Sequence, residues 1–300
     1  MNKHLLEDCT LCPRNCHVDR TQGQIGKCSE TDELVVARAA LHMWEEPCIS
    51  GEKGSGTVFF SGCAMGCVFC QNKNIAKGLT GRKITIERLA GIFMELQDKG
   101  ANNINLVTPS HYVPQIIDAV KSARRKGLHL PIVYNSSGYE KVETIKLLKD
   151  SVDIYLPDFK YKAGKIGEKY SNTDNYFQYA SEAIKEMVRQ TGEPVFNEGG
   201  MMTKGVIVRH LTLPGYLKDS KDILEYLYKT FGDKIYISIM NQYTPLSWVE
   251  QYPEINRKIT AAEYDELVQY ALYLGVENGF IQEGETASGS FIPEFNEEGV

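Results

Sequence analysis

Three cysteines, Cys63, Cys67 and Cys70, stand close together in the sequence and are the first candidates for chemistry. Their Cys-x3-Cys-x2-Cys spacing puts three thiolates on one tight loop, and the glycines beside them let the backbone wrap closely around a bound group. Three thiolates can hold three irons of a [4Fe–4S] cluster and leave one iron open to another ligand. A structural zinc would need a fourth protein ligand. The spacing therefore favours an iron–sulfur site, with zinc as the alternative.

A second group of four cysteines lies within the first 28 residues. Four thiolates at this density suit a tetrahedral metal site, which would hold a structural zinc or a single iron, or an auxiliary iron–sulfur cluster. Spacing alone does not choose among these metals. Cys48 stands apart, and we expect it to be a buried or free cysteine. The predicted ligands of this second metal site are Cys9, Cys12, Cys16 and Cys28.

Composition limits the classes of partner and compartment. The chain has 300 residues, 42% of them hydrophobic, and a net charge of −6. Acidic chains without a basic stripe do not suit nucleic acid, and no apolar run is long enough to span a bilayer. The first residues have no apolar core of a signal peptide. We therefore expect a cytoplasmic protein without nucleic-acid or membrane partners, in which clustered thiols serve as metal ligands rather than disulfides.

The elements that must position these cysteines follow from hydrophobic periodicity. Residues 1–45 are rich in cysteine and short of apolar periodicity, so we predict a small metal-binding N-terminal subdomain there. In residues 46–300, strand-like apolar runs alternate with amphipathic helices, which predicts an α/β fold with a parallel sheet, in the form of a partial (β/α)6 barrel. The predicted strands are 57–60, 104–107, 131–134, 152–156, 206–211 and 234–240, and the predicted helices are 85–99, 113–126, 141–149, 176–190, 222–231 and 261–274.

The motif around the three cysteines also carries a resemblance. With Phe69 before the last cysteine, it resembles the signature of the radical S-adenosylmethionine (radical SAM) superfamily. The flanking Phe-Phe-Ser-Gly-Cys and Cys-Gln-Asn are similar to the pyruvate formate-lyase activating enzymes, and more closely to their PflX-type branch. Further blocks similar to that branch are 44–47, 103–109, 152–160 and 209–211.

The resemblance implies a function. The open iron of the [4Fe–4S] cluster would bind the methionyl amine and carboxylate of S-adenosylmethionine. One electron, from a reductant such as flavodoxin or ferredoxin, would cleave the sulfonium and release a 5′-deoxyadenosyl radical that abstracts hydrogen from a substrate. The substrate would be a glycyl-radical protein, which makes this an activase, or alternatively a small molecule or peptide. From another class, the alternative is a non-catalytic iron–sulfur electron-transfer protein.

Functional groups are expected at the carboxyl ends of the strands. In strand 206–211, side-chain alternation lets only one of Arg209 and His210 face inward, and we choose Arg209, whose guanidinium suits a carboxylate. The stretch 241–243 stands where the activating enzymes carry a histidine, so the resemblance leaves the substrate open, and His111 is an alternative to that histidine. The resemblance places cofactor contacts at Phe69, Thr108 (through its backbone), Asn135, Ser137, Asp158, Lys160 and Arg209.

Overall fold

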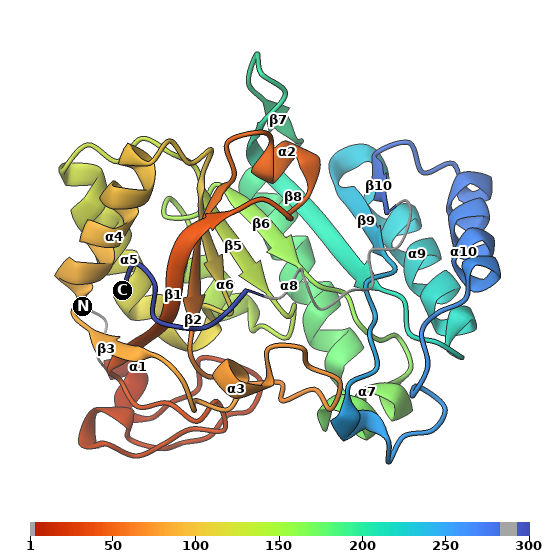
Figure 1. Cartoon of the computed structure of the whole chain (residues 1–300), viewed down its shortest axis with the longest axis horizontal. Coiled ribbons are helices and arrows are strands. Elements are labelled where there is room, and N and C mark those ends of the chain that lie inside the picture. The colour runs from red at the N-terminus through yellow and green to blue at the C-terminus, as the bar shows by residue number, and fades with distance from the viewer. Residues whose placement is uncertain (1–3, 283–292) are drawn as a thin grey trace.

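Parallel strands form the centre of one large sheet (Figure 1). The computed structural model describes residues 4–282 and 293–300, and within them the strand order is β10-β9-β8-β6-β5-β4-β2-β1-β3. All neighbours from β2 to β10 along this order pair in parallel. This confirms the predicted α/β class with a parallel sheet. The parallel strands are β2 (Ser55–Phe60), β4 (Ile104–Val107), β5 (Ile132–Ser136), β6 (Ile154–Pro157), β8 (Met202–Leu211), β9 (Tyr236–Met240) and β10 (Gly279–Ile281).

The sheet is open in the part of the chain that the structure describes, because β10 and β3 are its two edges. Barrel-like closure is therefore not observed, and the partial barrel stays a prediction. All six strands expected from the sequence are present, and β10 adds a further parallel strand beside β9. Strand β10 was not predicted from the sequence, because it is only three residues long.

The main helices follow the strands as predicted, and each begins and ends within a few residues of its expected bounds. Thr85 accepts a hydrogen bond of 3.1 Å from the backbone N–H of Arg88 and so caps α4, as its sequence position suggested. The main helices are α4 (Ile86–Asp98), α5 (Val113–Arg125), α6 (Val142–Leu147), α8 (Tyr176–Thr191), α9 (Leu217–Phe231) and α10 (Ala261–Leu274), and the shorter ones are α1 (His4–Glu7), α2 (Pro47–Ser50) and α3 (Lys73–Ala76). Helix α7 (Gly164–Ser171) and the three short helices α1, α2 and α3 were not predicted.

Side-chain alternation divides each central strand between two faces of the sheet. In β8, Val206 and Val208 join the large hydrophobic core, whereas Ile207 joins a second, smaller core. The short helix α2 supplies Cys48 and Ile49 to that second core, together with Ile154 and other inward residues. Helix α2 therefore covers the inner face of the sheet, which is opposite the face that packs against the long helices. The inner face is where the polar strand-end residues point.

The N-terminal segment is tied to the sheet by strand β1 (Leu34–His42), which pairs antiparallel with both β2 and β3 (Arg82–Ile84). The end of the chain runs beside β1, where the backbone N–H of Ala39 donates to the carbonyl oxygen of Glu298 at 2.8 Å. Within residues 1–45, β1 is thus part of the sheet, while the cysteine-bearing residues before it form irregular loops (Figure 1).

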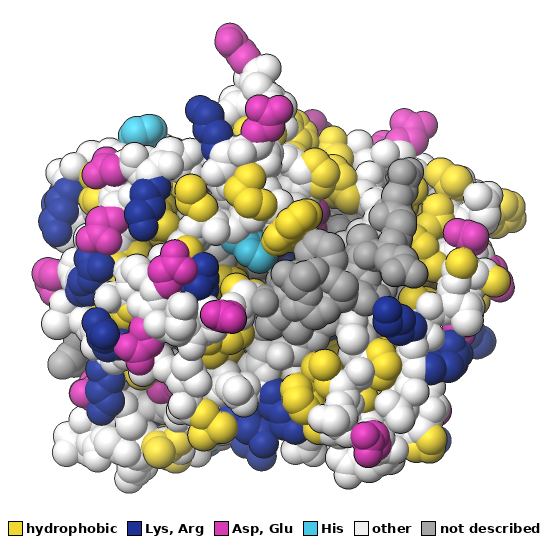
Figure 2. Space-filling model, in the orientation of Figure 1, with side chains coloured by type: hydrophobic (Ala, Val, Ile, Leu, Met, Phe, Trp, Pro, Cys, Tyr) yellow, Lys and Arg dark blue, Asp and Glu magenta, His cyan; other side chains and the backbone are white. Residues whose placement is uncertain are grey.

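The surface carries mixed charge on the face seen in Figure 2, where basic and acidic side chains alternate over the left flank. Ion pairs on the protein surface include Arg82 with Glu297 and Arg88 with Glu95. Among the described residues, no helix is both long and apolar enough to cross a membrane.

Candidate active site

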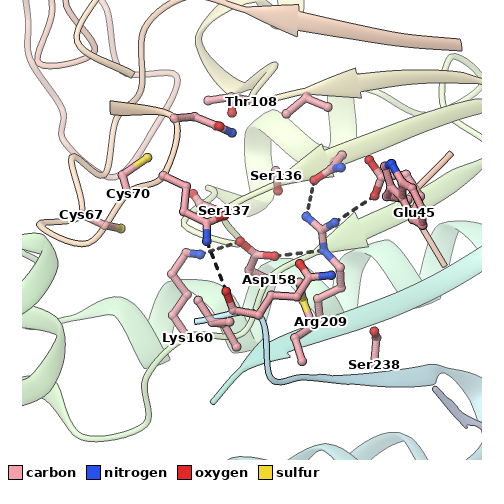
Figure 3. Close-up of a pocket in the computed structure, with 18 of the residues that line it drawn as sticks. Glu45, Cys67, Cys70, Thr108, Ser136, Ser137, Asp158, Lys160, Arg209 and Ser238 are labelled. Carbon is pink, nitrogen blue, oxygen red and sulfur yellow. Dashed lines mark hydrogen bonds and ion pairs between the residues drawn. The ribbon is translucent and has the colours of Figure 1, made fainter. Parts of the chain in front are cut away.

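A cavity of about 470 Å³ opens at the carboxyl ends of the parallel strands, on the inner face of the sheet (Figure 3). This volume is in the range of small-molecule sites in proteins. The N-terminal cysteines do not line it. The sequence-predicted residues that the structure brings together around it are Cys63, Cys67, Cys70, Phe69, Thr108, Asn135, Ser137, Asp158, Lys160 and Arg209.

The loop that carries the three cysteines follows β2 directly and turns at Gly62. Gly62 has a φ of +87°, and a Cβ there would lie 2.6 Å from the carbonyl oxygen of Cys28. Only glycine fits this close approach without displacement of the neighbouring backbone. The loop is further held by Arg14, which donates hydrogen bonds to the carbonyl oxygens of Ala64 at 2.8 Å and Ser171 at 3.0 Å.

Two thiols of this loop, those of Cys67 and Cys70, have raised pKa values. Burial raises the pKa of Cys67, and it raises the pKa of Cys70 to about 12. The positive charge of Lys160 acts in the opposite direction on both thiols. Metal ligation requires thiolates, so a bound iron would supply most of the charge that ionises them. Near Cys67, the hydroxyl of Ser171 lies 3.0 Å from its sulfur and can donate to a thiolate.

Aromatic side chains surround the last cysteine of the loop. Phe69 is buried, and its ring packs edge-on against Tyr170 and Tyr243, with centroids 6.4 and 5.9 Å apart. Such packing fixes the loop and keeps water away from one side of the cysteines.

Three thiols, those of Cys63, Cys67 and Cys70, line the cavity on one loop. Among the described residues, no group of three or more Cys, His, Asp or Glu side chains is placed to hold a single metal ion. In a cubane cluster each thiolate binds a different iron, so the sulfurs stay apart. Three thiols on one loop at the wall of a cavity therefore fit a [4Fe–4S] cluster.

A chain of charged side chains crosses the cavity from the cysteine loop (Figure 3). Lys160 Nζ lies 2.5 Å from Asp158 Oδ2, and Arg209 Nε lies 3.1 Å from Asp158 Oδ1. Arg209 also donates to Asn135 Oδ1 at 2.6 Å and to Glu45 Oε2 at 3.1 Å. Burial alone would raise the pKa of Asp158, but the charges of Lys160 and Arg209 outweigh it and hold that pKa below its usual value. Asp158 therefore remains ionised.

Alternation in β8 decided which of two adjacent residues faces the cavity. Arg209 lines it, whereas His210 is buried behind it and donates from Nδ1 to the carbonyl oxygen of Phe159 at 2.7 Å. His111 does not line the cavity either. It is buried and donates from Nε2 to the carbonyl oxygen of Ser61 at 2.7 Å, and burial lowers its pKa to about 3. Both histidines thus support backbone turns.

The turns after β4 and β5 have unusual backbone. Thr108 lines the cavity with a φ of +58°, a conformation that a β-branched residue rarely adopts. Such strain tends to persist where a functional site requires it. After β5, Gly138 has a φ of +74°, and a Cβ there would lie 2.1 Å from the carbonyl oxygen of Asp158. The polar turn at 135–138 therefore packs directly on the Asp158 backbone.

Two acidic residues of the site were not predicted, namely Glu45 and Glu46. They precede α2 and line the cavity beside Arg209 and Ser238. Burial raises the pKa of both carboxyl groups, against the opposing charge of Arg209. The only sequence signal was their place in the 44–47 block of the resemblance, because no strand end precedes them. At the opposite side, Gln242 and Tyr243 line the cavity after β9.

The four N-terminal cysteines lie together beneath the cysteine loop. The sulfurs of Cys16 and Cys28 both lie close to Gly26, and Cys12 interacts electrostatically with Cys16 and Cys28. Cys28 likewise interacts with Cys9. Burial raises the pKa of Cys12 to about 12 and that of Cys28 to about 11. Although these thiols are neighbours, they too are not placed for a single ion among the described residues.

Comparisons with known proteins agree with the resemblance that the cysteine loop carries. The family model of the radical SAM superfamily matches residues 57–227, more than half of the chain. The chain is 30% identical over 277 residues to the uncharacterized protein MJ0674 of Methanocaldococcus jannaschii, an alignment that covers 90% of this chain and 75% of the relative.

Among solved structures, three share a similar arrangement at low identity. SuiB of Streptococcus suis has a TM-score of 0.48 at 15% identity, over 77% of this chain and 48% of SuiB. A domain of the pyruvate-formate lyase-activating enzyme of Bacteroides vulgatus has a TM-score of 0.41 at 13% identity, over 57% and 92%. Methylornithine synthase (PylB) has a TM-score of 0.48 at 13% identity, over 79% and 75%. Likeness of this degree carries no information about activity. The family match, by contrast, establishes that this chain belongs to the radical SAM superfamily.

Proposed function

We propose that this protein is a radical SAM enzyme whose Cys63, Cys67 and Cys70 hold a [4Fe–4S] cluster at the cavity on the inner face of the sheet. The observation that carries the proposal is the wall of that cavity, where the three thiols face a cation–carboxylate chain across a volume of about 470 Å³. When bound, the reduced cluster supplies the electron that cleaves S-adenosylmethionine and yields a 5′-deoxyadenosyl radical.

The side chains of the cavity have distinct tasks in this proposal. Lys160 donates one hydrogen bond to Asp158, and its charge also stabilises the Cys67 thiolate. Arg209 has a single partner on each terminal nitrogen, so both nitrogens keep a donor for the carboxylate of the cofactor. Thr108 offers backbone groups to the methionyl amine, and Asn135 and Ser137 lie where the ribose would bind. Asp158 holds the two cations in place.

The test is anaerobic reconstitution of the full chain with iron and sulfide, followed by dithionite and S-adenosylmethionine. We expect 5′-deoxyadenosine and methionine as products. A fully loaded, reduced protein that releases neither product would contradict the proposal and leave the electron-transfer alternative.

Within this function, we propose that the protein belongs to the PflX-type branch, and that it acts as a glycyl-radical activase. The support is the resemblance of the cysteine motif and of blocks 152–160 and 209–211. Incubation with candidate glycyl-radical proteins should produce a glycyl EPR signal in one of them. Turnover of S-adenosylmethionine without any such signal would favour a small molecule or peptide as the substrate.

We also propose a second metal, as zinc, iron or an auxiliary cluster, at Cys9, Cys12, Cys16 and Cys28 of the N-terminal subdomain. Support comes from the mutual proximity of these thiols and from the raised pKa values of Cys12 and Cys28, which a metal would offset. Replacing Cys12 with Ala should remove this metal and lower the unfolding temperature. Metal analysis that shows the same zinc and iron per chain in both proteins would argue against the site.

A further inference from the structure

The acidic end of the cavity is the part that the proposed cofactor does not explain. Figure 3 shows Glu45 on the far side of Arg209 from Cys67 and Cys70. Glu46 lies next in sequence and caps the start of α2, which covers the inner face of the sheet. A cofactor held at the cysteine loop would therefore leave this end of the cavity to a substrate.

Among the described residues, Glu46 forms no ion pair of its own, although the charge of Arg209 also acts on its carboxyl group. Lys160 pairs with Asp158, and Arg209 pairs with Asp158 and Glu45. Among the described residues that line the cavity, three carboxylates thus face two permanent cations. His42 does not restore the balance, because burial and the charges of Arg38 and Arg209 lower its pKa and keep it neutral.

One oxygen of the Glu46 carboxyl group also lacks a hydrogen-bond partner among the described residues. The Glu46 side chain lines the cavity, the residue is only 8% exposed, and the oxygen without a partner is Oε2. A buried carboxylate oxygen without a partner is costly, so it is expected where a ligand completes the site. Apolar side chains stand nearby on the cavity wall, namely Leu211, Met240 and Ile281.

We propose that Glu46, together with Glu45 and Ser238, is a substrate subsite that binds a cationic ammonium or guanidinium group carried on an apolar stem. The inference rests on the proposed function, because the cofactor must occupy the cysteine end of the cavity.

The probe is n-pentylammonium, compared with pentan-1-ol and pentanoate, which have similar size but no positive charge. Their binding to the reconstituted full chain is measured by ligand-observed NMR without reductant, both with and without S-adenosylmethionine. We expect the ammonium to bind at least about tenfold more tightly than the alcohol, and pentanoate to bind weakest.

The matched variants are Glu46→Gln and its control Glu52→Gln. Each removes one negative charge, and the two positions are six residues apart. Glu52 is exposed on the surface and does not line the cavity. Glu46→Gln should abolish the preference for the ammonium over the alcohol, whereas Glu52→Gln should keep it. If Glu46→Gln does not fold, the comparison of the three probes on the wild-type protein still shows whether the cavity prefers the ammonium group.

Three outcomes overturn the inference: equal binding of ammonium and alcohol, an unchanged preference in Glu46→Gln, or displacement of S-adenosylmethionine by the ammonium. The last would assign the acidic end to the cofactor. Release of 5′-deoxyadenosine by the wild-type protein is scored separately. Cleavage without ammonium preference would therefore refute the subsite alone, and ammonium preference without cleavage would refute the proposed function alone.

Discussion

The backbone N–H of Cys63 donates a hydrogen bond of 3.1 Å to the carbonyl oxygen of Cys28. This bond joins the last cysteine of the N-terminal set to the first cysteine of the cavity loop. The neighbouring Gly62 permits it, since any side chain there would collide with the same carbonyl group. The two cysteine sets are therefore mechanically coupled, and disturbance of one should reach the other.

Replacement of Gly62 by Ala tests this coupling. The variant should lose iron from the cavity loop. Its free energy of unfolding should also fall by more than the roughly 1–2 kcal/mol that a non-glycine residue in the left-handed conformation costs by itself. Gly100→Ala is the matched control, because Gly100 has a similar φ of +84° but open space around its Cβ. Iron per chain and urea unfolding measure both effects. Equal losses in the two variants would show that the Cys28 contact has no special role.

Replacement of Cys67 by Ala should abolish cleavage of S-adenosylmethionine and the visible absorbance of the cluster, because two thiolates do not retain the cubane. Cys48→Ala serves as the control, since Cys48 is buried in the small core with Ile49 and belongs to neither cysteine set. It should keep its iron and its absorbance. An intact cluster in the Cys67 variant would move the ligand set elsewhere.

Replacement of Arg209 by Leu should lower the free energy of unfolding by about 3 kcal/mol, because it leaves Glu45 as an unpaired, buried carboxyl group and leaves Asp158 with Lys160 alone. Lys185→Leu breaks an exposed pair with Glu182 and should cost less than about 1 kcal/mol. Urea unfolding compares the two variants. Arg209→Lys keeps the charge but loses the planar fork, so its affinity for S-adenosylmethionine should fall more than tenfold, about 1.4 kcal/mol.

The pH dependence of stability should report Glu140. Burial raises the pKa of this carboxyl group from 4.5 to about 7, and its hydrogen bonds from Ser110 and Tyr134 only partly oppose the effect. Between these two values the folded protein binds more protons than the unfolded chain. Stability should therefore be complete below pH 4.5 and fall as the pH rises to about 7, by at most about 3 kcal/mol.

Glu140→Gln removes this titration, so its unfolding free energy should not show that decline. The difference between the two proteins should grow from pH 5 to pH 7 in urea titrations and then stay constant. Parallel stability curves over this range would mean that Glu140 has an ordinary pKa in the folded state.

The sequence was most informative for elements whose formation depends on the pattern of apolar residues within one segment. Hydrophobic runs and amphipathic periods predicted β2, β4, β5, β6, β8 and β9 with their helices, because each element is stabilised by its own alternation of apolar residues. Strand β10 is only three residues long, so its pairing with β9 in the folded chain defines it.

The same division holds at the candidate site. The sequence by itself determined the cysteine loop after β2, the polar strand ends, and the preference for Arg209 over His210, since all of these follow from spacing and alternation along one segment. The tertiary structure alone decided that Glu45 reaches Arg209, across 164 residues of sequence, and that Cys28 contacts Cys63. Such contacts depend on how distant elements pack, and no period in the sequence encodes the distance between them.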